Sequence, residues 1–362
     1  VPRGIGLVIG VSTFPTWNGY PAIFADLATG NPVIVKPHPA AILPLAITVK
    51  VARETLKEAG FDPNLVLLAA DEANAPITQE LAKRPEVALI DYTGGPGFAD
   101  WLEKNAGHAT LFAEKAGVNT VVIESTGDAK GMLQNLAFSL SLYSGQMCTT
   151  PQTIFIPAEG IETEAGRQSF DDVARGLAVA IDRLLGDPGR AAEILGCIQN
   201  PAVLERVDGA AREGIVVRQS ASLQHPQFAA ARVQTPLLVK VDARREAVYG
   251  SETFGPVTYL VPVESGADGV SRAMALARSK GAITAALYST DKTLIAQAVD
   301  AAAEAGVALS CNLTGGIYVN QSAAFSDYHA TGCNPAANAS LTDAAFVAPR
   351  FHVAQARIPV VA

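Results

Sequence analysis

The first third of the chain alternates short apolar runs, rich in β-branched residues, with longer segments of helical periodicity. This alternation predicts β-strands joined by helices, an arrangement in which neighbouring strands run parallel. The predicted strands span residues 5–10, 32–36, 65–69, 87–92 and 110–113, and the predicted helices span 21–29, 46–59, 75–83 and 98–105. We therefore expect an α/β fold with a doubly wound parallel sheet.

A second α/β pattern follows the first. The apolar run at 120–123 predicts a strand, and 129–144 and 166–185 predict helices. A chain of 362 residues also exceeds the usual size of one domain. We therefore expect two domains, a cofactor-binding one at 1–117 and a catalytic one at 118–340.

The sequence patterns at the two ends of the chain lead to two separate predictions. Residues 351–361 alternate between apolar and polar side chains, as an exposed strand does. Because unpaired edge strands often pair with another subunit, we expect 341–362 to form an oligomerisation tail and the chain to assemble as a homo-oligomer, a dimer or a tetramer. Residues 4–10 already have the pattern of a buried strand, so we expect an N-terminal portion to be missing.

Charge, hydropathy and cysteine spacing indicate which classes of binding partner and metal site are not expected. The formal net charge is −8 and no Lys/Arg-rich stripe occurs, so nucleic acid is not an expected partner. No apolar run reaches the roughly 18 residues that cross a bilayer, so no membrane is expected. The four cysteines have neither the spacing of a zinc site nor that of a disulfide framework. We expect no metal and reduced thiols, as in the cytoplasm.

Three features of the first domain suit a ligand. Asn18 lies in a Pro/Gly-rich segment, where its amide could stabilise a developing oxyanion or cap the next helix. Lys36 ends a predicted strand and could bind a ribose hydroxyl or phosphate, or lie in solvent. Gly94 and Gly95 form a strand-to-helix turn that lets backbone approach a pyrophosphate, or they serve the turn alone.

Glu114 and Cys148 are the candidates for chemistry. Cys148 lies in a loop after an apolar helix, where a thiol is accessible. Glu114 ends a strand near the predicted domain boundary, so it could act as a general base, or it could be an exposed partner of Lys115. The remaining cysteines are interpreted as small core residues; they are Cys197, Cys311 and Cys333.

A tight Gly/Pro loop carries Glu252 and Phe254, and its carboxylate could accept ribose hydroxyls or stabilise the turn. Together with the preceding features, this loop occurs in the order found in the aldehyde dehydrogenase superfamily, which the chain resembles over residues 1 to about 260. The motifs that carry the resemblance are Trp17-Asn18, Val35-Lys36-Pro37, Thr93-Gly94, Glu114 with Gly117, Gly145-Gln146-x-Cys148 and Glu252-x-Phe254-Gly255-Pro256-Val257.

The resemblance implies a role for each motif. Cys148 would be the nucleophile that attacks an aldehyde, Asn18 with the Cys148 backbone N–H would form the oxyanion hole, and Glu114 would activate the hydrolytic water. The cofactor would be NADP or NAD. Lys36 and Glu252 would hold its two riboses, and Phe254 would pack against its nicotinamide.

Departures from the family pattern bear on the cofactor. Relatives that prefer NAD commonly carry a Glu where this chain has Pro39, and that carboxylate accepts ribose hydroxyls and repels a 2′-phosphate. With Pro39 there and His38 beside it, we expect NADP to be accepted and preferred. Gly95 also replaces the usual Ser of the Gly-rich turn, which leaves the phosphate position open.

The last hundred residues resemble the phenylacetic acid degradation (PaaN-type) branch of the family, through 325–329 and Pro349-Arg350-Phe351. That resemblance implies semialdehyde substrates from ring cleavage. Two alternatives remain. One is a thiol hydrolase or acyltransferase, for which no motif links a histidine to Cys148. The other is a truncated dehydrogenase fold that acts as a binding or scaffold subunit.

Overall fold

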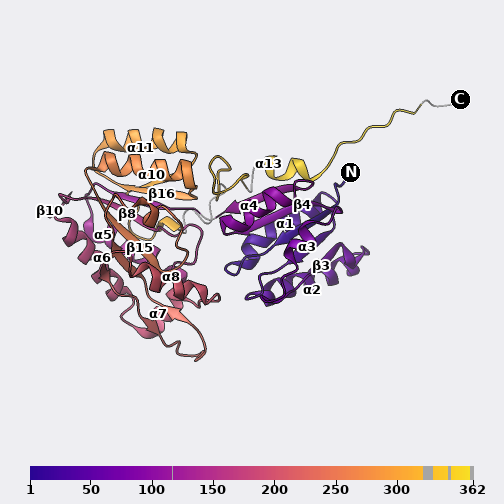
Figure 1. Cartoon of the computed structure of the whole chain (residues 1–362), viewed down its shortest axis with the longest axis horizontal. Coiled ribbons are helices and arrows are strands. Elements are labelled where there is room, and N and C mark those ends of the chain that lie inside the picture. Colours follow the sequence, from indigo (N-terminus) through magenta and orange to yellow (C-terminus); the bar gives the residue numbers. More distant parts are fainter. Residues whose placement is uncertain (116, 321–328, 341–343, 359–362) are drawn as a thin grey trace. The chain divides into compact units, whose positions relative to one another are not determined.

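The computed structural model describes residues 1–115, 117–320, 329–340 and 344–358. The chain divides into two compact units (Figure 1). Unit 1 comprises Val1–Lys115 and Ala339–Ala362, and unit 2 comprises Ala116–Asn338. The C-terminal residues therefore belong to unit 1, although they follow unit 2 in the sequence.

Unit 1 is built on a five-stranded sheet in which all neighbouring strands are parallel. The strand order is β3-β2-β1-β4-β5. The first strand, β1, is therefore central, with β2 and β3 on one side of it and β4 and β5 on the other. The predicted doubly wound parallel sheet is confirmed. The strands are β1 (Ile5–Ile9), β2 (Val33–Lys36), β3 (Val66–Leu68), β4 (Val87–Gly94) and β5 (Thr110–Lys115).

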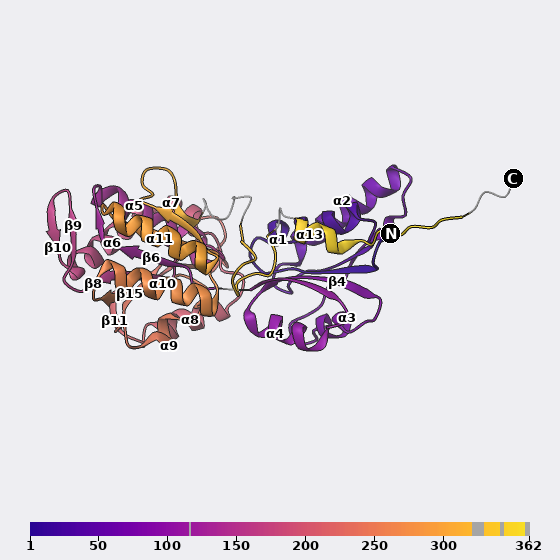
Figure 2. The same ribbon diagram turned by 90° about the horizontal axis from the view of Figure 1, so that it is seen from above.

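Helices cover both faces of this sheet, with α1 and α2 on one side and α3 and α4 on the other (Figure 2). Successive side chains of a strand point to opposite faces, so both faces of β1 are apolar. Val8 packs in the cluster that contains Ile23 and Leu45, whereas Leu7 packs in the one that contains Leu102. The helical elements are α1 (Pro15–Ala28), α2 (Ile42–Glu58), η1 (Pro63–Leu65), α3 (Thr78–Ala82), α4 (Pro96–Asn105), α13 (Ala344–Val347) and η3 (Ala348–Arg350).

The fully buried Arg350 ties the C-terminal residues to unit 1. Its guanidinium donates through both Nη atoms to Asp91 on β4, at 2.5 and 2.8 Å, and through Nη1 to Asp26 on α1, at 2.6 Å. The rings of Phe112 and Phe346 lie 4.1 and 4.3 Å from the guanidinium carbon. The arginine that served as a family signature in the sequence is thus a core residue that joins two buried carboxylates.

The predicted strand at 351–361 is not formed over residues 352–358, which are exposed and outside any strand. Phe351 makes one bridge to Pro2, and the Val1 amino group donates to the His352 carbonyl at 2.6 Å. A strand needs a hydrogen-bonding neighbour along its length, and among the described residues the backbone pairing of this segment is given only at Phe351 and His352. Residues 359–362 lie outside the described part.

Unit 2 contains a seven-stranded mixed sheet of order β11-β14-β15-β8-β6-β16-β17. Among the described residues of this sheet, the β11–β14 pair is antiparallel and the other neighbouring pairs are parallel. Its strands are β6 (Thr120–Ile123), β8 (Thr153–Pro157), β11 (Ile215–Arg218), β14 (Leu237–Lys240), β15 (Val257–Val263), β16 (Thr284–Tyr288) and β17 (Ala308–Cys311). Two smaller sheets comprise β7 (Ser125–Thr126), β9 (Ile161–Thr163) and β10 (Gly166–Gln168), and β12 (Ser222–Leu223) and β13 (Val233–Gln234).

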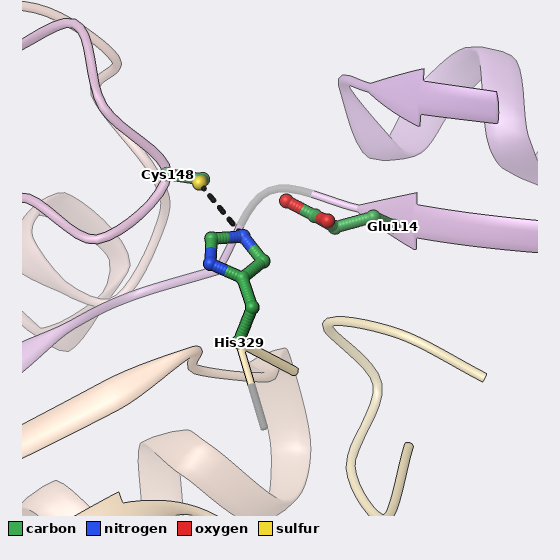
Figure 3. A group of neighbouring side chains, drawn as sticks. All are labelled: Glu114, Cys148 and His329. Atoms are coloured by element: carbon green, nitrogen blue, oxygen red, sulfur yellow. Dashed lines mark hydrogen bonds between the residues drawn. The ribbon is translucent and has the colours of Figure 1, made fainter. Parts of the chain in front are cut away.

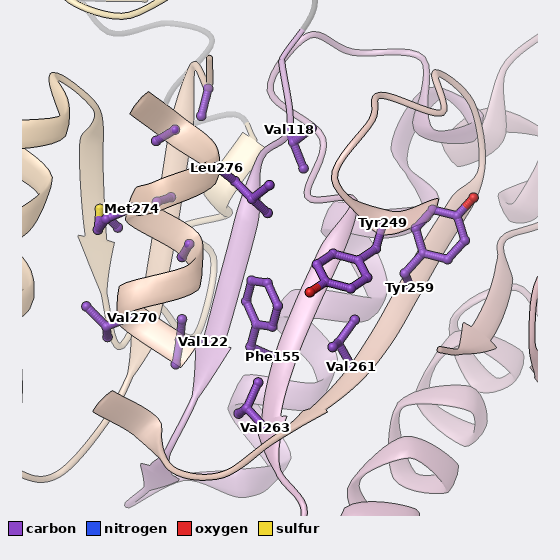
Figure 4. Packing of buried hydrophobic residues seen from close by; sticks show 14 of the residues in the cluster. Val118, Val122, Phe155, Tyr249, Tyr259, Val261, Val263, Val270, Met274 and Leu276 are labelled. Atoms are coloured by element: carbon purple, nitrogen blue, oxygen red, sulfur yellow. The ribbon is translucent and has the colours of Figure 1, made fainter. Parts of the chain in front are cut away.

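The core of unit 2 lies on both faces of the large sheet. On β8, Phe155 packs in the cluster that includes Met274 of α10, and its ring meets Tyr249 edge-on at 5.7 Å (Figure 4). The neighbouring Ile154 points to the opposite cluster, with Leu136 of α5. The helical elements are α5 (Ala129–Ser141), η2 (Leu142–Gly145), α6 (Phe170–Leu184), α7 (Pro188–Leu195), α8 (Ala202–Ala210), α9 (Glu246–Tyr249), α10 (Gly266–Lys280) and α11 (Lys292–Ala305). Within the described residues, no helix has both the length and the apolar character needed to cross a membrane.

Candidate functional site

Several predicted site residues of unit 1 share one edge of its sheet. Because the strands are parallel, their carboxyl ends meet at that edge, where Lys36 ends β2, Gly94 ends β4 and Glu114 lies one residue before the end of β5. Glu114 is paired in register with Thr93. The strand order extends from β1 in both directions, and open α/β sheets bind ligands at such a point.

The turn at Gly94 and Gly95 packs against Tyr92 on one side and has open space on the other. A side chain at Gly94 would collide with the ring of Tyr92, whose hydroxyl donates to the Gly95 carbonyl at 2.8 Å. A Cβ built on Gly95 or Gly97 would meet no atom of the described residues within 4 Å. The start of α4 therefore has free space in front of it.

Lys36 is buried, not solvated. Its ammonium lies 2.6 Å from a carboxylate oxygen of Asp71 and donates to the Pro37 carbonyl at 3.0 Å. Sequence reasoning missed Asp71, which lies in a loop with no motif. Pro39 and His38 follow and are partly exposed. Burial and the Lys36 charge lower the pKa of His38 below its ordinary value, so this imidazole is mainly uncharged at neutral pH.

Asn18 lies inside α1, so the predicted loop at this position is wrong, and so is the alternative of a helix cap. The helix begins at Pro15, whose fixed φ suits a first helical turn, after Phe14 in the left-handed conformation (φ 48°). The Asn18 side-chain amide donates to the Thr13 carbonyl at 3.3 Å. Its role as an oxyanion donor stays a prediction.

Lys115, which the simpler alternative paired with Glu114, has two carboxylate partners on α4. The Lys115 ammonium lies 2.6 Å from Glu103 and 3.1 Å from Asp100, both on α4. Glu114 itself is partly buried at the end of β5. Lys115 is thus engaged by α4, and the role of Glu114 as a base stays a prediction.

In unit 2, a tight turn leads from α5 to Cys148. Tyr143, Ser144 and Gly145 all have left-handed backbone, with φ of 60°, 51° and 63°. A left-handed tyrosine is uncommon, and tertiary contacts hold the conformation here. The Ser144 hydroxyl is buried against the Gln234 carbonyl, and a Cβ on Gly145 would collide with the Gly255 backbone. The position of Cys148 is therefore set by packing on both sides of this turn.

A buried asparagine, Asn119, anchors the segment that follows. Its side-chain amide donates to the carbonyls of Cys148 at 2.6 Å and Thr150 at 3.1 Å. Its side-chain oxygen accepts from the backbone N–H groups of Ile283 and Thr284, at the start of β16. Asn119 thus links the cysteine segment to the sheet, and sequence reasoning missed this residue because no motif marks it.

His329 lies beside Cys148, although no sequence motif links a histidine to this thiol. A hydrogen bond joins Cys148 Sγ and His329 Nε2 at 3.3 Å, and the two side chains point toward each other (Figure 3). His329 is 2% exposed. The two residues are 181 positions apart in the chain, so no local pattern could have paired them.

The loop of Glu252 and Phe254 is held next to the cysteine segment. The Gln152 amide donates to the carbonyl of Ser251 at 2.9 Å, and its oxygen accepts from the Thr253 N–H. Met147, Glu252 and Phe254 line the same small pocket. Burial raises the pKa of Glu252 to about 8, although nearby Arg206 acts in the opposite direction. Glu252 therefore holds its proton at neutral pH in this structure.

Of the three cysteines expected in the core, Cys311 packs against the core of unit 2, whereas Cys333 does not lie in a core. Cys333 is exposed, because it lies in a surface turn after Gly332, and Cys197 and Cys311 are only partly buried. The predicted family signature at 325–328 lies outside the described residues.

Comparisons with known proteins agree with this arrangement. Residues 1–337 match the model of the aldehyde dehydrogenase family. The crystal structure of an NAD-dependent aldehyde dehydrogenase from Burkholderia multivorans is 55% identical, with a TM-score of 0.96 over 99% of this chain and 65% of that one. The α/β architecture is therefore shared with a solved member of the family.

Curated relatives are more distant. A sulfoacetaldehyde dehydrogenase from Neptuniibacter caesariensis is 26% identical over 73% of this chain, and a 2-aminomuconic semialdehyde dehydrogenase from Danio rerio is 25% identical over 75%. The chain spans 54% and 55% of their lengths, about half of the relatives that it matches. Since the family model matches nearly the whole chain, this protein belongs to the aldehyde dehydrogenase family.

Proposed function

We propose that the chain carries the catalytic and cofactor-binding parts of an enzyme that oxidises an aldehyde to a carboxylic acid with NAD(P). The observation that carries this proposal is Cys148, presented by a tightly held turn within the family-matched residues and placed next to the Glu252 loop. An accessible, positioned thiol is what covalent aldehyde chemistry requires.

The proposed chemistry begins with addition of the Cys148 thiolate to the carbonyl carbon, which moves an electron pair to the aldehyde oxygen. The Cys148 N–H and the Asn18 amide would stabilise that oxyanion. NAD(P), when bound, would supply the acceptor for the hydride of this carbon; as the C–H bond breaks, the oxyanion electron pair re-forms the carbonyl and leaves an acyl thioester on Cys148. Glu114 would then take a proton from the water that releases the acid from Cys148. The presence of Glu114 favours a carboxylic acid as the product over a coenzyme A thioester, since acylating relatives usually lack this glutamate.

The residues of unit 1 fit a dinucleotide. The free space in front of Gly95 would admit a pyrophosphate at the start of α4. Lys36 stands at the same edge of the sheet, at the end of β2, with β1 between it and β4. In unit 2, the Glu252 carboxylate would accept ribose hydroxyls, and Phe254 would pack against the nicotinamide. Each of these roles is part of the proposal.

NADP is expected to give a higher kcat/KM than NAD, by about fivefold to tenfold, because Pro39 leaves no carboxylate to repel a 2′-phosphate. Steady-state kinetics with both cofactors measure the ratio. A Pro39→Glu variant should reverse it toward NAD. A wild-type preference for NAD, as the name of the Burkholderia relative indicates for that protein, would contradict this prediction.

Cofactor affinity is expected to increase as the pH rises through about 8. The pKa of Glu252 is raised, so its carboxyl is neutral below that pH, and ionisation creates the stronger acceptor for ribose hydroxyls. Isothermal titration with NAD at pH 7 and pH 9 would measure the change. Glu252→Gln should bind more weakly at pH 9 and lose the dependence. An equal dependence in both proteins would remove Glu252 from the ribose site.

The proposed substrates are semialdehydes from ring cleavage, as in the phenylacetic acid degradation branch. Two observations support this class: the resemblance of Pro349-Arg350-Phe351 to that branch, and the similarity to an enzyme named for 2-aminomuconic semialdehyde. A panel of short aliphatic aldehydes and dicarboxylic semialdehydes should show the highest kcat/KM for the latter. Equal values across the panel would contradict the class.

We also propose a cytoplasmic homo-oligomer. The exposed segment 352–358 supports assembly, because its backbone is available to pair with a second copy. Light scattering should report a dimer or tetramer for the chain and a smaller species after removal of residues 352–362. A wild-type monomer would contradict it.

The central test is absorbance of the reduced cofactor with aldehyde, comparing wild type with Cys148→Ala. Wild type should form NAD(P)H and the carboxylic acid, and the variant should bind cofactor without turnover. Cofactor binding without turnover in wild type would instead support the alternative of a scaffold role. Acyl-CoA formation on addition of coenzyme A would remove Glu114 from its proposed role.

A further inference from the structure

We propose that His329 is the group that accepts the thiol proton of Cys148 and holds the resulting thiolate in position. This inference rests on the proposed function only for the use made of the thiolate, because the proton transfer itself needs neither aldehyde nor cofactor. Its basis is the 3.3 Å contact between Sγ and Nε2 within unit 2.

The apolar surroundings of Cys148 give a proton acceptor a role. Cys148 packs against an apolar cluster of Ile283, Ala330, Ala336 and Ala337. Apolar surroundings disfavour a charged thiolate, whereas an adjacent imidazolium favours it. A group in direct contact can offset part of the loss of solvation, and His329 is in contact with the Cys148 sulfur.

His329 belongs to a segment that is fixed independently of the thiol. Asn334 donates to the carbonyls of Ala282 at 2.9 Å and Gly306 at 2.8 Å, and its oxygen accepts from the Ala336 N–H. Thr331 also donates to the Gly306 carbonyl. These anchors join the residues after His329 to the ends of α11 and β16, just as Asn119 fixes the backbone of Cys148. The contact thus connects two positions that are each held by the sheet.

The transfer balances without any further reagent. The S–H bond breaks, its electron pair stays on sulfur, and the proton forms an N–H bond at Nε2. The imidazolium N–H then donates to the thiolate. When sulfur adds to an aldehyde carbon, the charge moves to the carbonyl oxygen and the proton remains on His329. His329 acts through Cys148, so we assign it a positioning role.

Alkylation of Cys148 by iodoacetamide, followed by peptide mass spectrometry from pH 5 to 10, tests the proposal. In wild type the rate should reach its plateau below the ordinary thiol pKa of about 8.5. In His329→Ala the rate at pH 6.5 should fall about tenfold or more, and the midpoint should move up. The exposed Cys333 serves as an internal reference, and its profile should not change.

Two carboxyl groups, those of Glu252 and Glu114, need their own controls in the alkylation experiment. Glu252 lies in the neighbouring loop, and Glu114 belongs to unit 1, so Glu114→Gln and Glu252→Gln should each keep the low midpoint. His352→Ala removes an exposed histidine and should match wild type. An unchanged Cys148 profile in folded His329→Ala, or a low midpoint lost only in a Gln variant, would overturn the assignment.

A second measurement covers the case in which His329→Ala does not fold. The ultraviolet absorbance of the thiolate, taken as wild type minus Cys148→Ala, should titrate well below pH 8.5. Titration at the ordinary value would overturn the proposal. Neither measurement requires turnover, so an inactive chain with a low midpoint would refute the proposed function and support this inference, and an active chain with an ordinary midpoint would do the reverse.

Discussion

Arg350→Met is expected to lower the free energy of unfolding of unit 1 by about 3–5 kcal/mol, the cost of leaving buried charge without its partner. The guanidinium is fully buried and binds the carboxylates of Asp91 and Asp26. Methionine would fill part of the space between the two phenylalanine rings but would leave both acids without a cation. Both tryptophans, Trp17 and Trp101, belong to unit 1, so tryptophan fluorescence in a denaturant series reports on this unit.

The loss should depend on pH in a defined direction. Burial and the neighbouring Asp91 raise the pKa of Asp26 to about 7, although Arg350 opposes them, and burial raises that of Asp91. A carboxyl with a raised folded-state pKa contributes stability below its unfolded value, near 3.8, and loses it as the pH rises through the folded value. Without Arg350 both pKa values rise further. The difference between variant and wild type should therefore be larger at pH 8 than at pH 5.

A matched control is available in Arg357→Met, which removes an exposed arginine of the tail and should leave the denaturation midpoint unchanged. If Arg350→Met unfolded at the same denaturant concentration as wild type, the ion pairs would not be what holds the C-terminal residues on unit 1. A deficit that grew toward low pH would contradict the raised carboxyl pKa values.

Asn119→Ala is expected to destabilise unit 2 by about 4 kcal/mol and to reduce turnover about 100-fold. Four backbone groups lose their partner: two carbonyls of the cysteine segment and two N–H groups at the start of β16. Buried groups without a partner cost about 1 kcal/mol or more each. Displacement of a nucleophile by about 1 Å can reduce a rate by 10²-fold.

Hydrogen exchange separates this effect from general unfolding. Peptides that contain residues 145–152 and 283–284 should exchange faster in Asn119→Ala, while peptides of unit 1 should match wild type. Asn105→Ala, at an exposed position on α4, is the control and should change neither exchange nor turnover. Normal exchange at 145–152 together with normal turnover would show that Asn119 does not position Cys148.

The sequence alone supported the fold class and most strands of unit 1, because strand and helix periodicities are local properties. The same locality explains why Lys36, Gly94 and Glu114 could be assigned to strand ends, and parallel strands bring such ends to one edge. Locality also explains where the prediction and the structure of the single chain differ. The helix start at Pro15 and the missing strand at 352–358 depend on contacts that a pattern of apolar residues does not contain.

Only the tertiary structure decided how the candidate site is held. His329 contacts Cys148 across 181 positions, and Arg350 reaches Asp26 across 324. No sequence pattern distinguishes Asn119 from other asparagines, because its role depends on the start of β16 lying next to it in the folded sheet. The periodicity of a chain determines which elements form, since that depends on neighbours in sequence. The partner of a thiol or a buried charge depends on how those elements pack, because the free energy of such a pair comes from solvent exclusion and contact between distant segments.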